Sequence, residues 1–129
     1  MNSKEKALHI SRIALDKKAE DIVIMNVKKS SILCDYFVVA SAESSRRVKT
    51  ISTAIVEGLY KVGVRINHME GEKEALWVLL DYSDVIVHVF YTETRKFYNL
   101  ERLWQDAPKE HFVSSFTWQN LLSKKKYPA

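Results

Sequence analysis

The chain is poor in the residues that interrupt or cross-link a fold, with one cysteine, two prolines and three glycines in 129 residues. The single thiol, Cys34, excludes an intrachain disulfide and a zinc site built from cysteines, and it favours a reducing compartment. So few glycines argue against a loop that cradles phosphate groups through its backbone. Most of the chain is therefore expected to form regular helices and strands within one domain.

Long hydrophobic runs are also missing from the sequence. No apolar segment approaches the roughly 20 residues that a membrane-spanning helix needs. Charged side chains from Lys4 to Lys18 interrupt the N-terminal region, which argues against a signal peptide. We expect a cytoplasmic protein that has no membrane partner.

Charge is unevenly distributed along the chain, whose net charge is +4. Residues 1–64 carry 11 basic and 7 acidic side chains, whereas residues 65–108 carry 5 and 8, and residues 109–129 carry 4 and 1. The acidic middle segment would repel phosphates, so a basic protein or a ribonucleoprotein surface is a better partner than naked nucleic acid. A general RNA-binding module stays open as an alternative, and so does a net charge that serves only solubility.

Hydrophobic periodicity predicts an α/β domain with a mixed sheet of about five strands and helices packed on it. One helix is expected over residues 3–19, and a second begins at Ser44 or Ser45 and ends at Gly63. One or two short helices are expected over residues 93–98 and 100–106, before Pro108, and the tail, residues 109–129, is expected to be partly ordered. The predicted strands are 22–27, 36–40, 64–69, 76–82 and 85–91.

The last two predicted strands form a hairpin around Ser83-Asp84, and its two faces differ in chemistry. One face is almost entirely aliphatic, as expected beneath helices; it carries Val78, Leu80, Tyr82, Val85, Val87 and Val89. The other face mixes large apolar side chains with two ionisable groups; it carries Trp77, Leu79, Asp81, Ile86, His88 and Phe90. Such a surface is typical of a protein interface, although a covering helix would explain it as well.

Catalytic motifs are not apparent in the sequence. Asp81 and His88 share a face and lie close enough for a hydrogen bond, but no Gly-x-Ser-x-Gly elbow accompanies them. Asp81 and Asp84 across the turn are a weak metal signal. We expect no cofactor and no metal, and keep a nucleotidyltransferase-like or hydrolase enzyme that uses Asp81 and His88 as the alternative.

Several blocks of the sequence, in order over residues 5–108, form a recognisable pattern. The blocks are Asp35-Tyr36-Phe37-Val38-Val39-Ala40-Ser41, Ser45-Arg46-Arg47-Val48, Glu70-Gly71-Glu72, the hairpin from Trp77 to Phe90, the segment from Arg95 to Trp104, and Asp106-Ala107-Pro108. Together they resemble the ribosomal silencing factor family, also called Iojap-like. Ser83 stands where the family often has glycine.

This resemblance implies a small domain over residues 1–108, related in shape to nucleotidyltransferases but not known to catalyse a reaction. It implies binding to the large ribosomal subunit through ribosomal protein L-fourteen, which blocks subunit joining and represses translation under nutrient limitation. It leaves a homodimer open. Arg46, Arg47 and Lys49 could contact rRNA phosphates, or could simply cover the surface of their helix.

Face alternation then selects the residues expected to bind the partner. The central patch is the mixed face of the hairpin, with acidic side chains at its rim and one aromatic neighbour. The predicted residues are Trp77, Leu79, Asp81, His88 and Phe90, with Glu70 and Glu72 as rim charges and Tyr98 as the neighbour.

Overall fold

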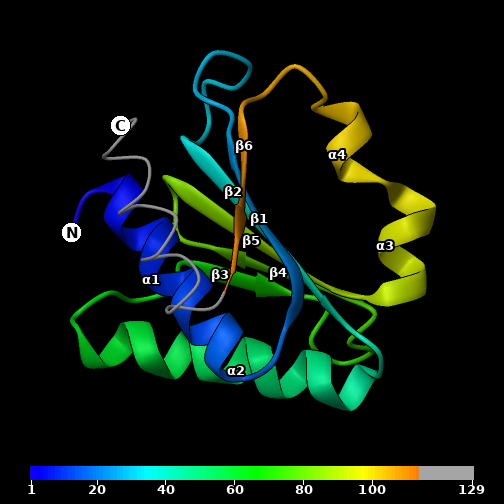
Figure 1. Cartoon of the computed structure of the whole chain (residues 1–129). Helices are drawn as coiled ribbons and strands as arrows, with labels where there is room; N and C mark the ends of the chain where they lie inside the picture. Colours follow the sequence, from blue (N-terminus) through cyan, green and yellow to red (C-terminus); the bar gives the residue numbers. More distant parts are fainter. Residues whose placement is uncertain (114–129) are drawn as a thin grey trace.

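A computed structural model describes residues 1–113, which form a six-stranded mixed sheet with helices on both sides (Figure 1). The strand order is β3-β4-β5-β2-β1-β6; β2 and β5 are parallel and the other pairs are antiparallel. The predicted α/β class is confirmed, with one strand more than expected. The elements are α1 (Ser3–Asp16), β1 (Glu20–Asn26), β2 (Tyr36–Ala42), α2 (Ser45–Lys61), β3 (His68–Glu70), β4 (Trp77–Asp81), β5 (Val85–Tyr91), α3 (Thr92–Tyr98), α4 (Leu100–Leu103) and β6 (Lys109–Phe112).

Helix α1 begins with a reciprocal capping box, in which Asn2 accepts from the backbone of Glu5 and Glu5 accepts from the backbone of Asn2. Ala7, Ile10 and Ala14 of this helix are buried in the core beneath it. The helix ends at Asp16, three residues earlier than predicted, because Lys18 takes a left-handed backbone conformation with φ of 64°.

Helix α2 begins and ends where the sequence predicted. The Ser44 side chain accepts a hydrogen bond from the backbone of Arg47, and Gly63 takes a left-handed conformation with φ of +84° just beyond the helix. Val48, Ile51 and other residues at helical spacing are fully buried against the sheet. Helices α1 and α2 together cover one side of the sheet (Figure 1).

The strand predicted over residues 64–69 is shorter in the structure, where β3 contains only His68–Glu70. The backbone N–H of Val64 donates to the carbonyl of Leu59, so the chain first closes the end of α2. Val64 and Ile66 pack on the core without pairing with a strand. The hydrophobic pattern was therefore a signal of burial and not of strand pairing.

The hairpin has the predicted register, with Trp77 opposite Phe90, Leu79 opposite His88 and Asp81 opposite Ile86. Its aliphatic face is buried beneath α1 and α2, as predicted. Pro108 is followed by β6, which pairs with β1 and begins in the segment assigned to the tail. The rest of that segment, residues 114–129, lies outside the described residues. No helix among residues 1–113 is long and apolar enough to cross a bilayer.

Candidate protein-binding site

The side of the sheet opposite α1 and α2, here called the distal face, carries most of the predicted binding residues. Alternation of side chains along each strand assigns them to this face. The distal face carries Val23 and Met25 on β1, Phe37 and Val39 on β2, Trp77, Leu79 and Asp81 on β4, and Ile86, His88 and Phe90 on β5. Glu70 and His68 of β3 pair with Leu79 and Asp81, so their side chains lie on the same side at the edge of the sheet.

Aromatic rings dominate the centre of the distal face. The Trp77 ring lies 4.9 Å from that of Phe90 and 4.8 Å from that of Tyr98, measured between ring centroids. Phe37 meets His88 edge-on at 4.9 Å and Trp104 at 5.1 Å. Such tilted and edge-on contacts are the favoured arrangements of aromatic pairs. Residues of α3 and of the segment after α4 thus close over part of the sheet.

This partial cover divides the predicted patch into an accessible part and a buried part. Trp77, Leu79 and Asp81 are half-buried, whereas His88 is 5% exposed and Phe90 is fully buried. Face alternation placed all five on one side of the sheet. It did not reveal that Leu100 and Trp104 join the buried cluster of Phe90, or that Tyr98 packs on Trp77, because these residues come from a later segment.

His88 is held as a neutral imidazole inside this cluster. The indole Nε1–H of Trp77 donates to its Nδ1 at 3.1 Å. Burial lowers the pKa of His88 to about 4, because a charged ring would lose its hydration there. Its Nε2 atom is buried and has no hydrogen-bond partner among the described residues.

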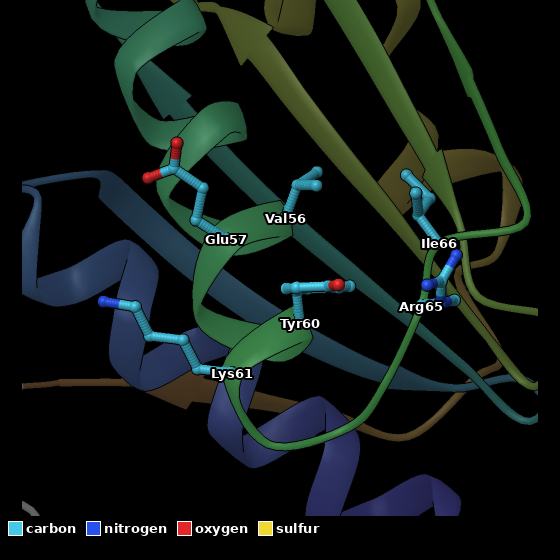
Figure 2. A pocket seen from close by; sticks show the side chains of 6 residues that line it. All are labelled: Val56, Glu57, Tyr60, Lys61, Arg65 and Ile66. Atoms are coloured by element: carbon cyan, nitrogen blue, oxygen red, sulfur yellow. The ribbon is translucent and has the colours of Figure 1, made fainter.

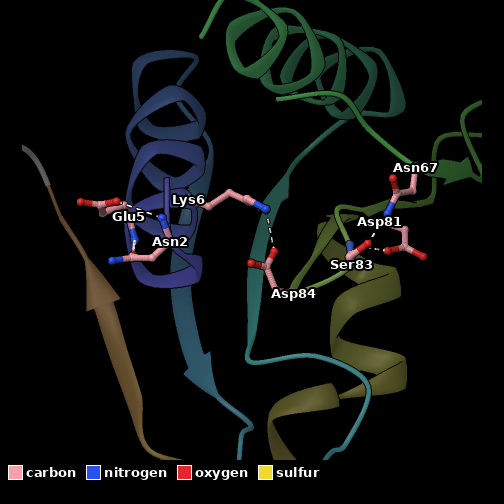
Figure 3. A network of polar contacts seen from close by, with 7 residues as sticks. All are labelled: Asn2, Glu5, Lys6, Asn67, Asp81, Ser83 and Asp84. Atoms are coloured by element: carbon pink, nitrogen blue, oxygen red, sulfur yellow. Dashed lines mark hydrogen bonds and ion pairs between the residues drawn. The ribbon is translucent and has the colours of Figure 1, made fainter. Parts of the chain in front are cut away.

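The Asp81 side chain stabilises the hairpin turn (Figure 3). Its Oδ1 accepts the backbone N–H of Ser83 at 2.8 Å, and Ser83 adopts a left-handed φ of 73°. The Ser83 hydroxyl also meets the Asn67 amide. The next residue, Asp84, pairs with Lys6 of α1 at 2.7 Å and so fastens the turn to the helical layer.

The catalytic alternative needed Asp81 to orient His88. Within residues 1–113 no hydrogen bond joins the two side chains: Nδ1 of His88 accepts from Trp77, and Asp81 accepts from Ser83. The arrangement that this hypothesis requires is therefore not assembled. A buried imidazole whose pKa is about 4 is also poorly matched to general base catalysis near neutral pH.

The predicted acidic rim is exposed beside Trp77. The Glu70 carboxylate lies within hydrogen-bond distance, 2.7 Å, of Nε2 of His68, and Glu72 lies in the loop that follows. This loop passes very close to β4 at Gly71, where an added Cβ atom would lie 2.0 Å from the carbonyl oxygen of Trp77. Glycine is required here because of that approach and because φ is +83°.

Further apolar side chains beside the distal face were not selected from the sequence. Phe97 is 80% exposed and Leu103 is 74% exposed, and Phe97 touches Tyr98 with 5.1 Å between ring centroids. On the loop before β2, Ile32 and Leu33 are also exposed. The sequence did contain a signal for these exposed side chains. They are apolar, and they lie in short segments that lack a second apolar face. Grouped apolar exposure of this kind marks interaction surfaces.

Arg95 is the residue that holds α3 and α4 in place. Its guanidinium is buried, donates to the Ser41 hydroxyl at 2.9 Å and pairs with Glu101 of α4 at 2.8 Å. One side chain thereby links β2, α3 and α4. The sequence alone gave it no role, because its partners lie 54 and 6 residues away.

A separate pocket of about 440 Å³ lies between α2 and the segment before β3 (Figure 2). Val56, Tyr60 and Ile66 provide much of its lining, and none of the predicted partner-binding residues takes part. Arg46, Arg47 and Lys49 are exposed in the first turns of α2, on the helical side of the sheet. The structure therefore does not bring them to the distal face.

Comparison with known proteins agrees with this architecture. A family model described as ribosomal silencing factor during starvation matches residues 1–127. The ribosomal silencing factor of Bacillus subtilis is 43% identical over 93 residues, which are 72% of this chain and 79% of the relative. That of Halalkalibacterium halodurans is 42% identical over 93 residues, 72% and 80% of the two chains. A crystal structure of a Chromobacterium violaceum protein superposes with a TM-score of 0.80 at 30% identity, covering 89% of this chain and 96% of the other. By sequence and by fold, the chain belongs to the ribosomal silencing factor family.

Proposed function

We propose that the protein binds the large ribosomal subunit through ribosomal protein L-fourteen and thereby prevents the small subunit from joining. Membership in the family supports the general role of a ribosome-associated regulator. The observation that carries the proposal is the distal face, where half-exposed Trp77 and Leu79 lie beside exposed Glu70 and Glu72.

The chemistry of this surface suits a basic ribosomal protein. Proteins embedded in rRNA need cationic side chains against the phosphates, so their free surfaces retain positive charge. An apolar centre contributes affinity, and an acidic rim steers a cationic partner and fixes its orientation. Aromatic side chains such as Trp77 are the usual energetic centres of such contacts.

Repression follows from occupancy of the surface at which the two subunits meet. A folded domain bound there leaves no room for the small subunit, so no catalytic step is required. Under nutrient limitation such a block would reduce the number of translating ribosomes. A homodimer, an rRNA contact through Arg46, Arg47 and Lys49, a cytoplasmic location and a nucleotidyltransferase-like shape stay predictions.

The test is subunit joining with purified bacterial subunits on a sucrose gradient. Added protein is expected to reduce the joined fraction when it is present before the subunits are mixed. Ribosomes that are already joined should respond slowly, because the surface is covered until they dissociate. Unchanged joining at saturating protein, with binding to the large subunit verified, would contradict the steric mechanism.

The enzyme alternative predicts a different behaviour. A nucleotidyltransferase-like or hydrolase activity would require binding of nucleotide or divalent metal by the purified protein. Calorimetry with ATP and Mg²⁺ measures this directly. The silencing mechanism predicts no heat of binding, and it predicts that subunit joining is inhibited equally with and without nucleotide.

A further inference from the structure

The buried imidazole of His88 has one nitrogen that the protein itself does not use. Indole is only a donor, so the contact from Trp77 makes Nδ1 the acceptor. A neutral imidazole then carries its proton on Nε2. That N–H group is buried and has no acceptor among residues 1–113.

Leaving a buried N–H group unpaired costs free energy, and packing alone does not require such a group at this position. Buried polar groups in folded proteins nearly always have partners, and each exception needs an explanation. The neighbours of His88 are the rings of Phe37, Trp77 and Phe90. A phenylalanine at this position would pack in the same surroundings without leaving a donor unpaired.

We propose that the Nε2–H group of His88 donates a hydrogen bond to a carbonyl oxygen of the protein that docks on the distal face. The inference rests on the proposed function, because it assigns one atom of that binding surface a role in recognition. It changes His88 from a contact residue, as the sequence suggested, into a specific donor below the surface.

The charge of the surroundings favours a neutral acceptor. Asp81 lies on the same face of β4, and Glu70 lies beyond Leu79, which is the residue opposite His88. These carboxylates would repel an incoming anion, and His88 offers no positive charge to attract one. A backbone carbonyl, or the side-chain carbonyl of asparagine or glutamine, meets no such penalty. The flat peptide group also suits a site bordered by aromatic rings.

Access requires a side chain of this cluster to move, and the contact between half-buried Trp77 and exposed Tyr98 is its accessible edge. Tyr98 lies on the Trp77 ring, is 48% exposed and is the last residue of α3. Asn99 follows it in a left-handed conformation with φ of 47°. Because Tyr98 belongs to α3 and not to a strand, moving its ring uncovers part of Trp77 and leaves the pairing of the sheet intact.

Two substitutions separate the donor from the packing. His88→Phe removes the donor and keeps a ring, whereas His88→Gln keeps an N–H donor near the position of Nε2. We expect His88→Phe to bind large subunits about tenfold more weakly, which corresponds to about one hydrogen bond. His88→Gln should recover most of this loss. The matched control is Val87→Ala, next to His88 on β5 with its side chain on the opposite, helix-covered side of the sheet, which should lower the melting temperature while leaving affinity unchanged below it.

A measurement on the wild-type protein tests the same atom without any substitution. Nitrogen NMR of the histidines should show the Nε2–H tautomer for His88 in the free protein. With purified ribosomal protein L-fourteen added, that proton should shift downfield and exchange more slowly with water. This measurement holds even if His88→Phe proves unstable.

The outcomes distinguish the two levels of the proposal. If wild-type protein binds and His88→Phe binds equally well, or the Nε2 proton is unaffected by L-fourteen, the donor role is wrong and the proposed function stands. If wild-type protein binds neither large subunits nor L-fourteen, both are wrong. Weaker binding of His88→Phe with recovery in His88→Gln supports both.

Discussion

Trp77 donates the hydrogen bond of its indole to Nδ1 of His88 at 3.1 Å, joining the half-exposed and the buried parts of the distal face. The two residues are diagonal neighbours on adjacent strands, since Trp77 pairs with Phe90 and His88 with Leu79. Docking that presses on the Trp77 ring therefore acts directly on the buried imidazole. The half-exposed and the buried residues of the distal face therefore form one continuous cluster.

Substitutions at two neighbouring residues of β4 should have different effects, one mainly on stability and the other mainly on binding. Val78 is fully buried beneath the helices, so Val78→Ala should lower the free energy of unfolding by about 1–3 kcal/mol without changing the affinity of the folded protein. Leu79 is only half-buried on the distal face, so Leu79→Ala should weaken binding to large subunits more than stability. Urea unfolding and binding assays on both variants measure this. Equal affinity losses in the two variants would mean that the distal face is not the contact surface.

Trp77→Ala is expected to affect both properties, because the side chain packs on Phe90 and Tyr98 and bonds to His88. Trp77→Ala would cost little stability only if the indole ring were fully exposed, and the ring is half-buried. Binding should fall by about 2 kcal/mol or more, the range of a central aromatic contact. Trp77→Phe keeps much of the packing and is the milder comparison. Measured at a temperature where both variants are folded, a retained affinity in Trp77→Ala would remove Trp77 from the interface.

Reversing the charge of the rim should slow association. The double variant Glu70→Lys and Glu72→Lys repels a cationic partner. Its association rate should therefore fall and depend differently on salt, whereas its dissociation rate should change less. Stopped-flow mixing at several salt concentrations measures both rates. The matched control is Asp16→Lys with Glu57→Lys, an equal charge change at exposed positions of α1 and α2. Tighter binding of the rim variant would place rRNA phosphate at this edge.

Acid should destabilise the protein through His88. The pKa is about 4 in the folded state and near 6.5 in the unfolded state, so between these values the unfolded state binds more protons. The loss begins as pH falls below 6.5 and is complete below about 4, where it reaches roughly 3 kcal/mol at 1.36 kcal/mol per pKa unit. Unfolding free energies of the wild type and His88→Gln across this range isolate the contribution. Parallel pH profiles would show that the imidazole is not held neutral.

Glycine should suit the hairpin turn better than the serine that is present. Ser83 has a φ of 73°, a region that costs residues with a Cβ atom about 1–2 kcal/mol. Ser83→Gly should therefore raise stability by about 0.5–1 kcal/mol, after allowing for the greater freedom of glycine in the unfolded chain. Ser83→Ala, which loses the same hydroxyl and keeps the Cβ, is the control and should not be stabilised. Thermal melts of the three proteins decide between strain and the hydroxyl contact as the dominant effect.

The sequence by itself determined the helix starts, the left-handed cap at Gly63 and the register and faces of the β4–β5 hairpin. These features depend on side-chain alternation and on hydrogen bonds between residues close in the chain, such as Asn2 with Glu5. It also determined which side of the hairpin packs beneath α1 and α2, because only one side is uniformly aliphatic.

Only the tertiary structure decided which distal-face residues a partner can reach. The burial of His88 and Phe90 depends on α3 and α4 folding back, and Arg95 secures them through a serine 54 residues earlier in the chain. The sixth strand likewise gains its hydrogen bonds from β1, more than 80 positions before it. Local periodicity carries no information about such distant contacts, because their stability depends on the whole sheet being assembled.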